Sequence, residues 1–345
     1  MPLISVTDEG TIIGVSGEGY FLKRNGRVFA RLPQGIIDQF VIGPDVEISR
    51  KALARMSDTG IPVAFIDRFG RLKTRLVPIW RHNARPRIGQ TLAWRDGVVR
   101  LSLAKRFVAA KLSNSAHVLN MYAKNYSDGA LRLVRDRLTG LAGKLVSASS
   151  VDEVMGVEGI GGKYYWEAFG LLLRCDFCKW NGRNRRPPKD PVNSVLSYTY
   201  AVVAQMALTY LELSGLDPYI GYLHSVDERK PSLALDLIEP FRALYADRLV
   251  LRLMNRGQIK SEDFEIDGHI NNGIYMKLEA RKLLVKEICD TINYCEEDMG
   301  MSSPQSALLD DIRRLKELAG AGRLCEFVPY FANKGDELYG CLDRL

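Results

Sequence analysis

Hydrophobic and polar residues follow a short period in the first third of the chain. Runs at 10–17, 20–24 and 27–32 are rich in β-branched and aromatic residues, which predicts three strands. Asn25-Gly26 separates the last two runs and is typical of a type I′ β-hairpin. Further strands are predicted at 39–43, 62–67 and 71–78, with a helix from Ser49 to Met56 that ends before Gly60. Short strands with frequent turns indicate a small β-sandwich.

From about residue 91 onward, apolar residues recur with a helical period. Residues 98–124 carry a broad apolar face, and Asp190-Pro191 has the residues of a helix start, with Gly215 as the matching stop. Further helices are predicted from Ser232 toward residue 257 and over 306–318. The segment 78–90 has prolines and arginines but no clear period. We therefore predict an α+β fold: an N-terminal β-sandwich domain (1–78), a linker (79–92) and a larger all-α domain (93–345).

Composition narrows the class of protein. The net charge is +7, which favours an anionic partner and nucleic acid above all. The N-terminus lacks the features of a signal peptide, and the longest apolar stretch, 200–213, is interrupted by Gln205 and Thr209. We therefore expect a cytoplasmic protein that does not bind membranes and whose six cysteines are reduced.

The segment 224–242 combines acidic residues with a histidine. Asp236 and Glu239 are three residues apart and so share one face of the predicted helix, for which Ser232 is a candidate cap. Carboxylates amid apolar residues are costly unless they are paired or bind a cation. His224 precedes the helix and Pro240 predicts a kink. The alternative is a salt-bridged helix with a structural histidine, its ion-pair partners being Arg229, Lys230 or Arg242.

Glu158 lies in a glycine-rich segment, 156–169, that ends in an aromatic run. A phosphate-binding loop is excluded because Val157 and Tyr164 stand where the Walker pattern needs glycine and serine or threonine. The glycines are better explained by close packing between helices. Taken alone, Glu158 is an ordinary surface glutamate.

A basic segment, 174–193, places aromatic residues among arginines and lysines. Basic side chains neutralise phosphates, and aromatic rings stack on unpaired bases, although a solvated basic loop is an equal alternative. Cys175 and Cys178 have the spacing of half a zinc site, but no second such pair follows. A redox motif is disfavoured by the helical context, and His82, His117 and His269 are interpreted as structural or surface residues.

Taken together and in this order, the motifs resemble the CRISPR-associated integrase that captures new spacers, the first-numbered Cas protein. The matching segments are Glu158-Gly159, the Arg-Arg-Pro-Pro-x-Asp-Pro-Val-Asn run at 185–193, Gly-Leu-Asp-Pro-Tyr at 215–219, His224, the run from Ser232 to Arg242, and Ala-Lys-Leu-x-Asn at 110–114. Glu239 stands where members often carry aspartate, and Gly161-Gly162 and Cys175-x-x-Cys178 depart from the family pattern.

The resemblance implies a helical catalytic domain, an N-terminal dimerisation domain, a homodimer and a small companion, the second-numbered Cas protein. It implies metal ligands at Glu158, His224 and Glu239, with Asp236 a further acidic catalytic residue. Such a donor set suits Mg²⁺ or Mn²⁺. We expect transesterification that joins a DNA 3′-hydroxyl to repeat DNA. The residues expected to contact double-stranded DNA are Arg183, Arg185, Arg186, Lys189, Arg242, Tyr164 and Tyr165, although the tyrosines could equally belong to the core.

Two other functions remain open from the sequence. A repair-type nuclease would use the same metal residues to cut DNA without joining strands. A catalytically silent DNA-binding scaffold would not depend on Glu158. A zinc-binding helical regulator, built on Cys175 and Cys178, is a more distant alternative.

Overall fold

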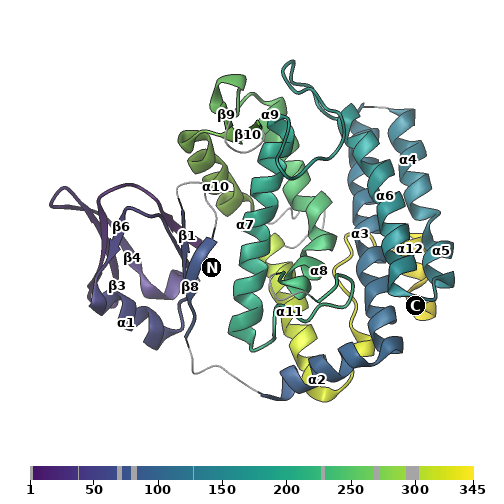
Figure 1. The fold of residues 1–345 in the computed structure, drawn as a ribbon, viewed down its shortest axis with the longest axis horizontal. Helices are drawn as coiled ribbons and strands as arrows, with labels where there is room; N and C mark the ends of the chain where they lie inside the picture. Colours follow the sequence, from purple (N-terminus) through teal and green to yellow (C-terminus); the bar gives the residue numbers. More distant parts are fainter. Residues whose placement is uncertain are drawn as a thin grey trace. The chain divides into compact units, whose positions relative to one another are not determined.

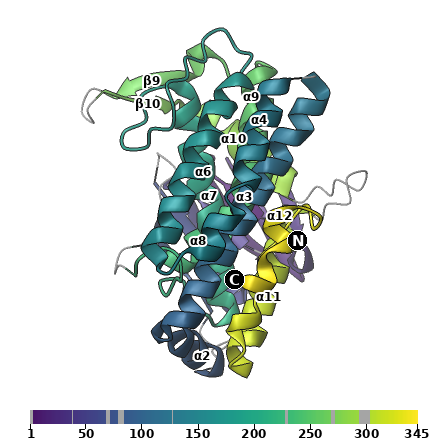
Figure 2. The same ribbon diagram turned by 90° about the vertical axis from the view of Figure 1, so that its right-hand side faces the viewer.

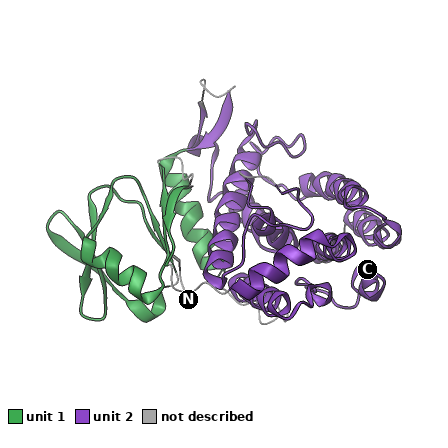
Figure 3. Ribbon diagram, turned by 60° about the horizontal axis from the view of Figure 1, so that its bottom comes forward, with its two compact units in different colours: residues 1–82, 277–293 green, residues 83–276, 294–345 purple. Residues whose placement is uncertain are grey.

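The computed structural model describes residues 3–37, 39–67, 72–78, 84–126, 128–226, 230–267, 272–292 and 303–345. The chain forms two units, residues 1–82 with 277–293 and residues 83–276 with 294–345 (Figure 3). The first is rich in strands and the second is mostly helical (Figure 1). The predicted α+β class is therefore confirmed.

Two four-stranded sheets make up most of the first unit. One has the order β1 (Leu3–Val6), β5 (Gln39–Ile42), β7 (Val63–Ile66) and β8 (Leu72–Leu76), parallel except for the last pair. The other has the order β4 (Arg27–Pro33), β3 (Gly19–Arg24), β2 (Thr11–Ser16) and β6 (Val46–Ile48). Its β2–β3 and β3–β4 pairs are antiparallel, and β6 is parallel to β2. The strands β1 and β6 were not predicted, because four and three residues are too few to show a period.

The two sheets share one hydrophobic core with α1 (Arg50–Thr59). Ile13 and Tyr20 come from one sheet, Phe40 and Val63 from the other, and Met56 from the helix. In the β3–β4 hairpin, Asn25 and Gly26 have φ values of 50° and 78°, which confirms the predicted turn with two left-handed residues. The helix begins after Ser49, whose side chain accepts a hydrogen bond from Ala52 N, and ends at the left-handed Gly60.

A helix from the C-terminal third completes the first unit. This helix, α10 (Leu278–Ile292), buries Ala280, Leu284 and Ile288, and its Lys282 forms an ion pair with Asp8 at 3.2 Å. The predicted division placed residues 277–293 in the helical domain. The structure differs because the chain returns to the first unit, and sequence order does not reveal such a return.

The second unit begins with α2 (Ala84–Arg95), which occupies most of the segment predicted as a linker, 79–92. Buried Gln90 explains the difference. Its side-chain amide donates to the carbonyls of Asp217 and Ile220 at 2.7 and 3.1 Å, and its carbonyl accepts from Asp217 N at 2.9 Å. These contacts fix a helix whose own sequence has little apolar periodicity.

Helices of very different lengths build most of the rest of this unit (Figures 1 and 2). They are α3 (Gly97–Tyr126), α4 (Gly129–Thr139), α5 (Ala142–Ser147), α6 (Val151–Leu171), α7 (Pro191–Ser214), α8 (Ser232–Phe241), α9 (Arg248–Asn255), α11 (Pro304–Ala321) and α12 (Glu337–Gly340). A two-stranded hairpin, β9 (Phe264–Asp267) and β10 (Gly273–Met276), interrupts them. Within the described ranges, none of the helices has both the length and the apolar character needed to cross a bilayer.

The predicted helix boundaries agree closely with the structure. Asp190 caps α7 by accepting from Asn193 N, Pro191 is its first residue, and left-handed Gly215 ends it. Ser232 was predicted as the cap of α8, and this is wrong: Pro231 precedes the helix, and Ser232 Oγ donates to Ser225 O at 2.6 Å. The helix passes through Pro240 and continues as a π-helix over Arg242–Asp247 before α9 begins.

The helix α3 is the central element for the site, because α4, α6 and α8 all pack against it (Figure 2). Buried Asn114 on α3 donates to Pro240 O at 2.8 Å and to Tyr330 O at 2.9 Å, and accepts from Ala332 N at 2.8 Å. One amide thereby joins α3, the end of α8 and the C-terminal segment, for which the sequence offered no interpretation.

Candidate active site

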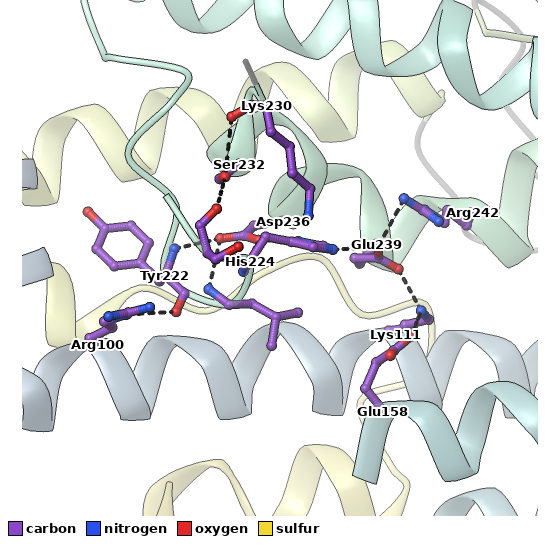
Figure 4. Close-up of polar contacts among 12 residues, drawn as sticks. Arg100, Lys111, Glu158, Tyr222, His224, Lys230, Ser232, Asp236, Glu239 and Arg242 are labelled. Carbon is purple, nitrogen blue, oxygen red and sulfur yellow. Dashed lines mark hydrogen bonds and ion pairs between the residues drawn. The ribbon is translucent and has the colours of Figure 1, made fainter. Parts of the chain in front are cut away.

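The three predicted ligands lie together, on three different elements of the second unit (Figure 4). Glu239 on α8 is 4% exposed, and its Oε1 lies 3.8 Å from Nε2 of His224, which follows α7. Glu158 on α6 and Glu239 both form ion pairs with the ammonium of Lys111. Residues separated by as many as 81 positions thereby lie around the Glu239 carboxylate and the Lys111 ammonium. Their role as ligands stays a prediction.

Asp236 holds His224 in place. The Asp236 carboxylate is fully buried; its Oδ2 accepts from the backbone N–H groups of Tyr222 and Leu223 at 2.6 and 3.0 Å. Its Oδ1 accepts from the His224 backbone N–H at 3.0 Å and lies 2.7 Å from His224 Nδ1. A neutral imidazole that donates its Nδ1 proton to Asp236 directs a bare Nε2 toward Glu239. Asp236 is therefore placed behind the histidine, as a positioning residue, and not among the converging donors (Figure 4).

Gly221 allows the loop before His224 to approach α8 closely. A Cβ atom at this position would lie 2.7 Å from the Ser232 carbonyl carbon and 2.9 Å from Asp236 Oδ2. Any side chain would therefore push the Tyr222–His224 backbone away from the carboxylate that binds it.

The surroundings of Glu239 keep its carboxylate ionised. Burial alone would raise the pKa of Glu239, but attraction by Arg242 and Lys111, with a smaller contribution from His224 when its imidazole is protonated, outweighs it and lowers the pKa to about 2. Arg242 Nη2 lies 3.0 Å from Oε1, and Lys111 Nζ lies 2.7 Å from Oε2. One ion pair that the sequence left open, Glu239 with Arg242, is thus present. Arg229, another candidate partner, lies outside the described residues.

The sequence did not single out Lys111, although it lies in the matching Ala110–Asn114 stretch. Its side chain is only 15% exposed. Burial opposes its charge, but Glu239 and Glu158 outweigh that effect, and the pKa of Lys111 is raised. A lysine within the apolar run of α3 was a signal, because a buried ammonium needs anionic partners.

The donor set agrees in its chemistry with a divalent metal. Two carboxylates and one imidazole are ligands that Mn²⁺ and Mg²⁺ accept. As the side chains stand, no three His, Cys, Asp or Glu residues of the described part are grouped closely enough to hold an ion. Instead, the Lys111 ammonium is bonded to both carboxylates. The three side chains are therefore suitable ligands for a divalent metal. In this structure the Lys111 ammonium neutralises the two carboxylates.

A glycine sets the distance between α6 and α3. A Cβ atom on Gly161 would collide with Leu112 Cδ2 and lie 3.3 Å from Leu141 Cδ1. The predicted packing role is therefore confirmed at Gly161. The residue that it faces, Leu112, directly follows Lys111 in α3. It does not apply to Gly156 and Gly159, where a Cβ atom would meet nothing within 4 Å.

The predicted DNA-contact residues divide into exposed and enclosed groups. Arg185, Arg186 and Lys189 are exposed, and Tyr164 is half-buried beneath Arg137, whose guanidinium lies 5.7 Å from the ring centre. Arg183 instead donates to Asn193 Oδ1 at 2.6 Å and Ser197 Oγ at 3.0 Å, and so holds the basic segment against α7. A contact with DNA stays a prediction for the exposed group.

Tyr165 belongs to the core. The sequence had left this open as the alternative to a contact with DNA. It is 5% exposed, and its hydroxyl donates to Asp247 at 2.8 Å. Tyr200 also donates to Asp247, and the Arg242 guanidinium lies 4.8 Å from the Tyr200 ring centre. Burial raises the pKa of Asp247 to about 6, although the two tyrosines and Arg242 partly oppose this. The sequence missed this network, which packs behind Arg242.

Cys175 and Cys178 form a disulfide, so the expectation of reduced thiols is wrong for this pair. A turn in which Cys178 N donates to Cys175 O at 3.1 Å brings them together. Sulfurs bonded to each other are unavailable to zinc. Of the remaining histidines, His117 is half-buried on α3, and His82 and His269 lie outside the described residues.

Comparisons with known proteins show the family of the chain. Residues 4–289 match the family model for CRISPR associated protein Cas1. The CRISPR-associated endonuclease Cas1 1 of Chlorobaculum tepidum is 31% identical over 286 residues, which cover 81% of this chain and 83% of that protein. A Cas1 protein from Thermotoga maritima has the same fold, with a TM-score of 0.77, 24% identity, and coverage of 92% of this chain and 97% of the other.

A second solved structure, described as a casposase bound to integration product, has a TM-score of 0.76 and 25% identity. The match covers 97% of this chain and 96% of the casposase. The family model covers the strands of the first unit as well as every residue that converges on Lys111. This chain therefore belongs to the CRISPR-associated Cas1 family.

Proposed function

We propose that this chain is a metal-dependent DNA endonuclease and integrase of CRISPR adaptation. The observation that carries the proposal is the arrangement of the three side chains: Glu158 and Glu239 share the Lys111 ammonium, and His224, oriented by Asp236, faces Glu239. Membership of the Cas1 family, the name endonuclease of the relative in Chlorobaculum tepidum and the integration product in the casposase structure support the same activity.

Glu158, Glu239 and Nε2 of His224 would hold Mn²⁺ or Mg²⁺. Such a cation polarises the phosphodiester and offsets the charge that develops during in-line displacement. The protein supplies ionised ligands, because the pKa of Glu239 is lowered to about 2, and a fixed imidazole, because Asp236 binds Nδ1.

The reaction we propose is transesterification of DNA. A 3′-hydroxyl oxygen forms a bond to phosphorus, the bond from phosphorus to the flanking 3′-oxygen breaks, and a proton lost by the attacking hydroxyl is balanced by one gained by the leaving oxygen. With water as the nucleophile, the same displacement hydrolyses the strand. Arg242 is poised beside Glu239 to bind a phosphate oxygen through its remaining N–H groups.

The exposed side chains of Arg185, Arg186 and Lys189 would bind the backbone of double-stranded DNA outside this centre. Contacts of this kind supply affinity that falls as salt rises. We further propose a homodimer that works with the small Cas2 companion, as the family resemblance implies.

A strand-joining assay tests the proposal. Purified protein, with and without the companion, is mixed with a short 3′-hydroxyl duplex, a supercoiled plasmid that carries a repeat, and Mn²⁺. We expect covalent joining by the wild type and its loss in Glu158→Gln, which keeps the size of the side chain. Cutting without joining would indicate a plain nuclease. DNA binding alone, equal in both proteins, would indicate a silent scaffold and refute the catalytic site.

A further inference from the structure

The ammonium of Lys111 is bonded to the two carboxylates that the proposed function assigns to the metal (Figure 4). Its contacts within the described residues are Glu158 and Glu239, and it extends from α3 between α6 and α8. We propose that Lys111 is an internal competitor of the metal: it satisfies the carboxylate pair without an ion, and it is displaced when a divalent cation binds. This inference rests on the proposed metal dependence.

The charges of the site favour competition between the metal ion and the Lys111 ammonium, and disfavour binding of both at the same time. Glu158 and Glu239 carry two negative charges, and Lys111 and Arg242 carry two positive charges, so these four groups sum to zero. A divalent cation added to the intact cluster would leave a net charge of +2 among side chains that are mostly buried. Removing an ammonium from the carboxylates relieves that repulsion, and it also frees the lone pairs that a metal needs.

Of the two cations, Lys111 is the one free to leave. Arg242 lies at the start of the π-helix, is 13% exposed and has its guanidinium 4.8 Å from the centre of the Tyr200 ring. Lys111 Nζ is bound to the carboxylates alone among described groups, at the end of a flexible four-carbon chain. Its displacement requires rotation about the bonds of that side chain.

A permanent structural ion pair is the competing interpretation. Under that interpretation, the metal would bind with Lys111 still in place, and removing the lysine would destabilise the protein equally with and without metal. Under displacement, the metal replaces the missing ammonium. Loss of Lys111 is then harmful only to the metal-free protein.

The experiment measures Mn²⁺ binding by isothermal titration calorimetry, and thermal unfolding with and without saturating Mn²⁺, on the full chain. Lys111→Met removes the charge and keeps the length. Lys105→Met is the matched control, because Lys105 is a buried lysine on the same helix that donates to a backbone carbonyl, Val146 O, at 3.0 Å. Lys111→Met/Glu158→Gln tests whether the ion binds at this site.

We expect Lys111→Met to bind Mn²⁺ at least about tenfold more tightly than wild type, because the ion no longer has to displace an ammonium from the two carboxylates. Its melting temperature should fall below the wild-type value without Mn²⁺ and return to it at saturation. The control should match wild-type affinity, and the double variant should lose the gain. Should Lys111→Met fail to fold without metal, Lys111→Gln, which keeps hydrogen-bond donors, should show the same tightening.

Equal or weaker Mn²⁺ affinity in Lys111→Met, or a melting-temperature gap that persists at saturation, would overturn the competition while leaving the metal site intact. Tightening that survives in the double variant would also overturn it, by placing the ion elsewhere. If no variant binds Mn²⁺, the proposed metal dependence fails, and this inference fails with it.

Discussion

Replacing Asp236 with asparagine should have two effects: it should destabilise the protein, and it should free the His224 ring from the group that orients it. The carboxylate accepts four hydrogen bonds, two at each oxygen, and all four donors belong to the segment Tyr222–His224. Asparagine keeps the shape of the side chain but offers one oxygen and one NH₂ group. If the NH₂ group faces Tyr222 and Leu223, two backbone donors lose their acceptor; if it faces His224, the backbone N–H of His224 loses its acceptor and Nδ1 must change from donor to acceptor.

The expected magnitude follows from that count. A buried donor left without a partner costs about 1–3 kcal/mol, so the loss of an acceptor by one or two donors costs about 1–6 kcal/mol. Asp236 is fully buried, and water cannot replace the lost acceptor without a rearrangement of the loop. Such a loss is a large part of the stability of about 5–15 kcal/mol that is usual for native proteins.

Urea unfolding of the wild type and Asp236→Asn, followed by circular dichroism, measures the difference in free energy. Asp310→Asn is the control, because the Asp310 side chain is 51% exposed and pairs with exposed Arg313; we expect a change within about 0.5 kcal/mol. Mn²⁺ affinity of the folded variant should fall about 10- to 100-fold, because the histidine loses the group that orients it. A loss of less than about 1 kcal/mol for Asp236→Asn would refute the reasoning, since about 1 kcal/mol is the lower end of the cost of a single orphaned donor.

Three other perturbations test separate parts of the structure. Asn114→Ala should cost about 3 kcal/mol or more in urea unfolding, because it orphans two carbonyls and one N–H; a cost below about 1 kcal/mol would contradict the role of this amide. Gly221→Ala should abolish strand joining while Gly156→Ala retains it, because a Cβ atom meets Asp236 only at the first position; equal activity would contradict the close approach. Asp247 has a folded pKa of about 6 against 3.8 ordinarily, so its proton is held more tightly in the folded state, and its contribution to stability falls as pH rises through this range. The wild type should therefore lose about 2 kcal/mol relative to Asp247→Asn between pH 4 and pH 6, and parallel stability curves would show that Asp247 does not titrate there.

The sequence predicted those elements whose signals are local. The hairpin at Asn25-Gly26 and the helix from Asp190-Pro191 to Gly215 each carry their own start, turn or stop residues, and the structure has them in place. The helix α2 was missed because its order comes from contacts with the loop after α7, such as those of Gln90. No local pattern encodes a partner more than a hundred residues away.

The same distinction applies to the candidate site. Glu158, His224 and Glu239 were predicted through the order of motifs, and the fold brings them together. Asp236 and Glu239 share a helical face, but only the structure shows that one orients a histidine while the other faces the cations. Lys111 was missed because a single lysine in a helix has no spacing of its own to indicate which acidic residues it meets.

The acidic residues along α8 and the π-helix show what limits cation binding at this centre. A carboxylate must be ionised to bind a metal, so protons compete with the ion wherever the pKa approaches the ambient pH. Buried Asp247 has a pKa raised to about 6, whereas eight residues earlier Glu239 has a pKa lowered to about 2. The difference arises because Arg242, Lys111 and His224 surround Glu239, while tyrosine hydroxyls are the direct partners of Asp247. Protons would therefore be poor competitors of the proposed metal for Glu239 near neutral pH, and the competitor that we propose is the ammonium of Lys111.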